Sequence, residues 1–228
     1  MQQEIFKYRI KLTKYGELKY ISHLDWQNLI IKTLRRCSLS LVLTEGFNKI
    51  PKTSFSPALP LFIESECELV YFQTHRALPQ NFKEIFEKNT NKNVKLIECL
   101  DLSKTQTKLP ALETLIQWAK YEAKVVLNKN ESILNFKELE YNTNKCLSCD
   151  EILIERKTKK GLNKVINYRK SLNFLEFKDG VVSFVLKCGQ DPIIPSFRAD
   201  EFLKTVYGDD SKFDVKRVCF FDKNLRVI

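Results

Sequence analysis

The stretch Tyr20–Phe55 (YISHLDWQNLIIKTLRRCSLSLVLTEGFNKIPKTSF) organises the sequence. Ser22 followed by Asp25 forms the pattern of a capping box, in which the serine oxygen accepts a free backbone N–H and the carboxylate binds another. A helix is therefore predicted to begin at His23. Apolar and small residues then recur at helical spacing, which predicts one buried stripe. The stripe contains Trp26, Leu29, Ile30, Thr33, Leu34 and Cys37.

Three basic residues of this helix lie off the stripe. Lys32 lies three positions before Arg35 and four before Arg36, so the three side chains are predicted to share the solvent side. A ridge of cations on one exposed helix face favours an anionic partner.

The loop after the helix adds an aromatic ring, an amide and two lysines. Phe47 and Asn48 can stack on a base and hydrogen-bond its edge, which is how single-stranded RNA is usually recognised. Two alternatives stay open: Phe47 can instead fill the core, and Asn48 can bond to the backbone of a turn. Lys49 and Lys52 add positive charge beside them.

The net charge of +10 is concentrated in two regions. Residues 1–57 hold ten Lys and Arg against four acids, and residues 151–170 hold seven against two. The rest of the chain is close to neutral, so the excess is clustered instead of being spread over the surface. The 29% of charged residues and 43% of apolar residues fit a soluble globular protein with room for two small domains.

The second basic region, Glu155–Lys164 (ERKTKKGLNK), lies where two strands are expected to meet. Its cations are predicted to bind phosphates, because arginine offers a planar fork and lysine a mobile point charge. The alternative is a hairpin that lysines keep soluble. The candidate nucleic-acid contacts in the C-terminal half are Arg156, Lys157, Lys159, Lys160, Lys164 and Arg198.

Catalytic and metal signals are weak. His23 and Asp25 are the one close His–carboxylate pair, but Asp25 already serves the cap, so His23 is a weak catalytic candidate and is expected instead to contact RNA or to support the fold. Cys146 and Cys149 form a lone CxxC, which lacks the further ligands of a zinc site. We expect no metal and no cofactor, and reduced cysteines in a cytoplasmic protein without a membrane segment.

The sequence resembles the radical S-adenosylmethionine-linked (radical SAM-linked) protein family. The resemblance is carried by Ile21–Glu66 (ISHLDWQNLIIKTLRRCSLSLVLTEGFNKIPKTSFSPALPLFIESE) and continues in LPALETLIQWAKYEAKV, LIERKTKKG and IPSFRADEFL. The family has no established activity and is often fused behind a radical SAM enzyme with a cobalamin-binding region. This resemblance implies a separately encoded radical SAM enzyme as partner. The sequence departs from the family pattern at Lys49, Ile50, Phe62 and Ala199.

Hydrophobic patterning predicts an α+β protein of two ferredoxin-like (β-α-β-β-α-β) domains in tandem, residues 1–105 and 106–228, with antiparallel sheets. The predicted strands and helices of the first domain are Phe6–Thr13, a helix from His23, residues 53–63, residues 67–74, Leu78–Lys88 and Asn93–Cys99. Those of the second are Thr114–Leu127, Ile133–Glu140, Ile152–Arg156, Lys164–Tyr168, Val181–Leu186, Asp200–Tyr207 and Phe213–Phe221.

Three functions are compatible with these patterns. The first is a non-catalytic accessory that binds tRNA or rRNA through both basic clusters and acts with a radical SAM enzyme. The second is a metal-independent RNA-processing enzyme that uses His23 for proton transfer. The third is a protein–protein adaptor of a radical SAM enzyme without nucleic acid, in which the basic clusters meet an acidic partner. An exposed aromatic patch around Phe47, Phe55 and Phe62 would favour it.

Overall fold

Strand β1 (Phe6–Lys14) forms where apolar residues alternate near the N-terminus. The computed structural model describes residues 4–104, 110–126, 134–157, 163–209 and 212–228. Tyr8, Ile10 and Leu12 of β1 are buried on one face of the strand, as the alternation predicts. The chain divides into two units, Met1–Leu115 and Ile116–Ile228, whereas the predicted boundary was between residues 105 and 106.

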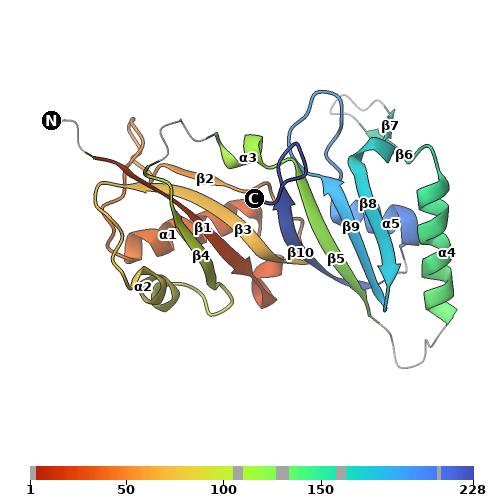
Figure 1. The fold of residues 1–228 in the computed structure, drawn as a ribbon, viewed down its shortest axis with the longest axis horizontal. Helices are drawn as coiled ribbons and strands as arrows, with labels where there is room; N and C mark the ends of the chain where they lie inside the picture. The colour runs from red at the N-terminus through yellow and green to blue at the C-terminus, as the bar shows by residue number, and fades with distance from the viewer. Residues whose placement is uncertain (1–3, 105–109, 127–133, 158–162, 210–211) are drawn as a thin grey trace. The chain divides into compact units, whose positions relative to one another are not determined.

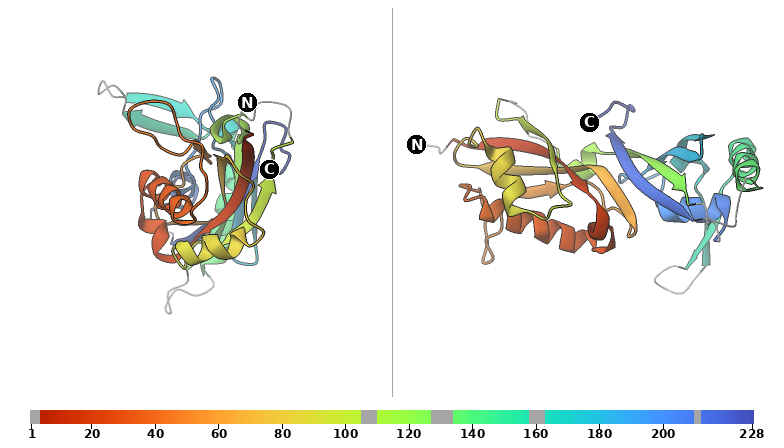
Figure 2. Two further views of the ribbon diagram at one scale, coloured as in Figure 1. Left: turned by 90° about the vertical axis from the view of Figure 1, so that its left-hand side faces the viewer. Right: turned by 90° about the horizontal axis from the view of Figure 1, so that it is seen from below.

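The first unit contains one antiparallel sheet in the order β4-β1-β3-β2 (Figure 1). Helices α1 and α2 lie on the same side of these strands (Figure 2, left). Its elements after β1 are the 3-10 helix η1 (Gly16–Tyr20), α1 (His23–Arg36), β2 (Thr53–Phe55), β3 (Ile63–Thr74), α2 (Phe82–Asn89), β4 (Leu96–Asp101) and α3 (Leu112–Leu115).

The core of the first unit fills the space between α1, α2 and the sheet. Trp26, Ile30 and Leu34 of α1 are almost completely buried against Phe72 of β3 and Phe86 of α2. Burial of the predicted α1 stripe is thus confirmed, with Leu29 only partly buried. A single packed face fixes how α1 is oriented and leaves its opposite side to solvent.

Residues 53–63 and 67–74 were predicted to be two extended segments separated by the polar segment IESE (Ile63–Glu66), and this prediction was wrong. Residues 63–74 form one continuous strand. The two glutamates of the segment are used internally, because Glu64 accepts from the Gly16 backbone N–H (2.8 Å) and Glu66 from the Tyr15 hydroxyl (2.9 Å). Charged residues in a strand are tolerated when their oxygens meet such donors.

The second unit contains an antiparallel sheet in the order β10-β5-β9-β8. A separate two-stranded ribbon, β6 with β7, is inserted between α4 and β8. The elements are β5 (Trp118–Val125), α4 (Leu134–Ser148), β6 (Leu153–Lys157), β7 (Asn163–Asn167), η2 (Arg169–Ser171), β8 (Leu172–Lys178), β9 (Val181–Lys187), α5 (Ala199–Tyr207) and β10 (Phe213–Phe221).

Apart from the ribbon and the short helices η1, α3 and η2, the two units have the same element order and the same strand order. The α+β class with antiparallel sheets is therefore confirmed. The segment Thr114–Leu127 was predicted to contain a strand, with a first half that could be helical. Its first residues do belong to the helix α3, and strand β5 begins at Trp118. Strand β8 was not predicted. None of the described helices is long and apolar enough to span a membrane.

Candidate nucleic-acid interface

Helix α1 begins at His23, as predicted, and is capped by Ser22. The Ser22 hydroxyl oxygen accepts from the Asp25 backbone N–H (3.1 Å). The Asp25 carboxylate accepts from the Ser22 hydroxyl (2.7 Å), whereas the capping-box prediction had it bind a backbone N–H. One backbone donor is thus satisfied by a side chain, and the carboxylate still favours the positive helix N-terminus.

The three cations of α1 lie on its solvent side. Lys32, Arg35 and Arg36 are exposed, and none of them forms an ion pair with any carboxylate in the described part of the chain. Their positive charge is therefore not neutralised by a carboxylate of residues 4–104, 110–126, 134–157, 163–209 or 212–228. A surface of this kind attracts anions at long range, an effect that salt screens.

The loop after α1 folds as a narrow hairpin, residues 42–52. The Lys52 N–H donates to the Val42 carbonyl (2.8 Å) and the Thr44 N–H to the Ile50 carbonyl (2.8 Å). The Arg35 guanidinium donates to the Lys49 carbonyl (3.3 Å), which ties the last turn of α1 to the hairpin. The backbone of Lys49 therefore lies next to the side chain of Arg35.

The tip of this hairpin carries Phe47 and Asn48. Phe47 is fully exposed (103%), so the alternative that it fills the core was wrong. The Asn48 carbonyl accepts from the Thr44 hydroxyl (3.5 Å), while its exposed side chain makes no hydrogen bond within the described residues. Lys49 and Lys52 are also exposed and have no ion-pair partner among the described residues. We call Lys32, Arg35, Arg36, Phe47, Asn48, Lys49 and Lys52 the helix–hairpin surface.

His23 and Asp25 are held by different neighbours. His23 Nε2 lies 2.9 Å from Gln27 Nε2, while the Asp25 carboxylate is bonded to Ser22. The imidazole of His23 thus contacts the side chain one helical turn later, whereas the carboxylate of Asp25 contacts the N-cap residue of α1.

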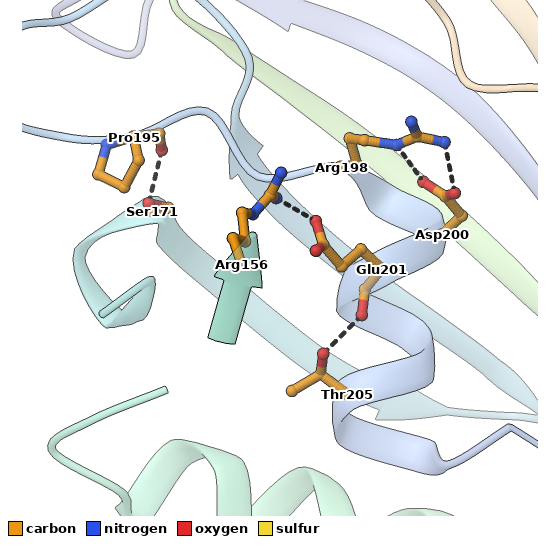
Figure 3. Close-up of polar contacts among 7 residues, drawn as sticks. All are labelled: Arg156, Ser171, Pro195, Arg198, Asp200, Glu201 and Thr205. Atoms are coloured by element: carbon orange, nitrogen blue, oxygen red, sulfur yellow. Dashed lines mark hydrogen bonds and ion pairs between the residues drawn. The ribbon is translucent and has the colours of Figure 1, made fainter. Parts of the chain in front are cut away.

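The second basic cluster differs from the first because its arginines are paired with carboxylates (Figure 3). Arg156 of β6 forms an ion pair with Glu201 of α5, and its guanidinium carbon lies 5.1 Å from the Tyr168 ring centroid. Arg198 binds Asp200 through both Nε (3.0 Å) and a terminal nitrogen (2.7 Å). The hydrogen bond to Asp200 raises the pKa of Arg198.

A pocket lies between the ribbon and α5, and its charges balance. Lys204 and Asp209 complete it as a third ion pair, 2.6 Å apart. Three cations and three carboxylates therefore line one pocket of about 640 Å³, together with Ile154, Thr205 and Gly208. A phosphate here would be repelled by three neighbouring carboxylates, which makes this pocket a less favourable anion site than a surface of cations without such partners.

The remaining cations of this cluster are on the ribbon. The predicted pairing of residues 152–156 with 164–168 is confirmed, with Arg156 opposite Lys164. Lys164 is exposed. The side chain of Lys157 and all of Lys159 and Lys160 lie outside the described residues.

Two further features were missed by sequence reasoning. Lys187 is 3% exposed and donates to the Gln117 amide oxygen (2.7 Å) and to Asp191 (3.0 Å). The backbone N–H groups of residues 194 and 193, followed by Lys187, lower the pKa of Asp191 to about 2. This carboxylate therefore stays ionised near neutral pH and anchors the loop after β9. The second feature is the contact between the exposed aromatic rings of Tyr20 and Phe62.

The cysteines show no metal-binding arrangement in the described part of the chain, where no three or more His, Cys, Asp or Glu side chains cluster suitably. Cys146 is buried, and burial raises the pKa of its thiol. A protonated, buried thiol is a poor nucleophile and a poor metal ligand.

These observations define an α+β protein of two similar units, the first of which carries an exposed basic helix–hairpin surface. The chain belongs to the bacterial family described as "Uncharacterized protein conserved in bacteria (DUF2344)", which it matches over residues 7–195. A search of curated proteins gives no match.

Proposed function

We propose that this protein is a non-catalytic accessory that binds tRNA or rRNA through its helix–hairpin surface and acts with a separately encoded radical SAM enzyme. One observation carries the RNA part: the five cations of that surface are exposed and have no carboxylate partner among the described residues, and the helix and hairpin that carry them are joined by the hydrogen bond from Arg35 to the Lys49 carbonyl. An exposed phenylalanine and an exposed amide lie among them. Cations grip phosphates, and aromatic and amide groups contact unpaired bases.

The radical SAM partner is proposed on the sequence resemblance. The ferredoxin-like fold of both units is proposed on their shared order of elements and strands, which is that of the split β-α-β unit. A cytoplasmic location belongs to the same proposal.

The adaptor alternative would place a protein on the same surface. Its predicted aromatic patch is not continuous, because Phe55 is 7% exposed while Phe47 and Phe62 are exposed. Five exposed cations without a carboxylate partner among the described residues favour a polyanion over an apolar protein face. An acidic partner protein would meet the same cations, and a titration with RNA separates the two.

Salt titration tests the proposal. If five cations each neutralise one phosphate, the logarithm of the association constant is expected to fall with the logarithm of salt concentration. The expected slope lies between about −3.5, the value for single strands, and about −4.5, the value for a duplex. Binding of a labelled total tRNA pool, measured by fluorescence anisotropy over a range of salt concentrations, provides this slope. Weak binding that salt does not change would contradict the proposal.

Arg156 supplies a second prediction, which separates the two clusters. Because its guanidinium is already paired with Glu201, Arg156→Ala is expected to change RNA affinity by less than about twofold and to lower the free energy of unfolding by about 1 kcal/mol. Arg35→Ala is the matched comparison and is expected to reduce the salt slope by about 0.7. Anisotropy titrations and urea denaturation measure both. A larger loss of affinity for Arg156→Ala than for Arg35→Ala would move the RNA site to the second unit.

A further inference from the structure

An exposed aromatic pair lies beside the N-terminal end of α1. The rings of Tyr20 and Phe62 meet edge to face, with centroids 5.6 Å apart. Tyr20 is 57% and Phe62 68% exposed. The pair is held in place by the backbone, because the Phe62 N–H donates to the Lys19 carbonyl (2.8 Å). The Lys19 ammonium lies 5.6 Å from the centroid of the Tyr20 ring.

Packing within the fold does not explain this pair. Phe62 has a φ of +68°, in the left-handed region that only glycine enters without steric cost. A strained phenylalanine is expected to bury its ring in return, yet most of this ring faces solvent. Backbone strain that gives no packing is typical of sites that bind something.

The charge beside the rings and their position along the chain indicate the occupant. Lys19 places a cation next to an aromatic face, the combination that binds a base together with its phosphate. Tyr20 stands three positions before His23, whereas Arg35 and Arg36 end the same helix. A helix of this length spans about 20 Å, so one strand lying along α1 can reach both ends. Asn28 and Lys32 are exposed between them.

We infer that Tyr20 and Phe62 form a stacking site for an unpaired base of single-stranded RNA whose phosphates lie on the helix–hairpin surface. The inference rests on the proposed function and narrows its substrate class to RNA with an unpaired segment, because a base in a duplex cannot stack on a side chain outside the helix. Lys19 contacts the phosphate next to the stacked base.

Phe62→Gly is the test, because glycine removes the ring and also relieves the left-handed backbone. The affinity for a short labelled single-stranded RNA of mixed sequence is expected to fall by about tenfold, while the melting temperature stays the same or rises. The affinity for an abasic RNA of equal length is expected to be the same for the variant and the original protein. Tyr20→Ala is expected to repeat the loss, and Phe62→Trp to retain binding.

The outcomes separate this inference from the proposed function. Unchanged affinity in Phe62→Gly, with affinity still lost on reversal of the α1 charges, would overturn the stacking site and leave RNA binding in place. If neither Phe62→Gly nor reversal of the α1 charges lowers the affinity for RNA, both the stacking site and the proposed function are overturned. An equal loss for abasic RNA would overturn stacking as well, since the ring would then act on the backbone of the strand. Unchanged RNA affinity together with loss of a co-purifying protein would make the pair a protein contact.

Discussion

Replacing Lys32, Arg35 and Arg36 together by glutamate is expected to weaken RNA binding on the order of 100- to 1,000-fold, which corresponds to about 3 to 4 kcal/mol. Each contact between an exposed cation and a phosphate contributes up to about 1 kcal/mol, and the reversed charges repel the strand. Because these side chains are exposed, the free energy of unfolding is expected to change by less than about 0.5 kcal/mol per residue. Anisotropy titrations and urea denaturation measure the two quantities.

A matched control exists in the same unit. Lys83, Lys88 and Lys92 are exposed on and after α2, so reversing them changes the net charge by the same amount on a different surface. This control is expected to lower affinity by less than about fivefold, through the long-range field alone. Equal losses in the two triple variants would show that only the net charge matters and that the helix–hairpin surface is not a site.

Local patterns predicted α1 well. Its start, its buried stripe and its exposed cations all depend on residues within a few positions of one another, and the structure agrees with each. Such features follow from helical periodicity and end capping, which the sequence expresses directly.

Long-range pairing could not be predicted. Arg156 appeared to be a free phosphate ligand, but its partner Glu201 is 45 residues away in the sequence. Whether Phe47 is buried or exposed depends on whether its loop folds over the core or extends into solvent. The composition of the loop does not decide between the two. Tyr20 is the last residue of η1 and Phe62 immediately precedes β3, and their rings meet because β3 packs against η1. No local sequence pattern indicates this contact.

A strand with charged residues also escaped prediction. The IESE segment lacks the apolar alternation of a strand, and its glutamates are explained only by donors at Tyr15 and Gly16 that the fold brings near. Sequence patterns thus identify which side chains are available at a surface. The fold decides which of them remain unpaired, and this difference is what distinguishes the first basic cluster from the second.

The indole of Trp26 is the group on which the position of α1 depends most. It is 1% exposed in the core of the first unit, and the equally buried Lys14 ammonium lies 5.7 Å from its ring centroid. Removing it leaves a cavity that the sheet cannot close without moving β1 or α1, since cores are packed at near-crystal density.

Trp26→Ala is therefore expected to lower the free energy of unfolding by about 3 to 5 kcal/mol, a large part of the stability of a domain of this size. The chain has two tryptophans, one in each unit, so the fluorescence of Trp118 then reports the second unit alone. In urea, the circular dichroism change of the first unit is expected at lower denaturant than the Trp118 signal, and RNA binding is expected to disappear with the first transition. Trp26→Phe, which keeps a buried ring, is the control and is expected to cost less. A loss below about 1 kcal/mol in Trp26→Ala would mean that packing of the α1 stripe does not hold the cations in place, and the hairpin contact from Arg35 to Lys49 would then have to do so.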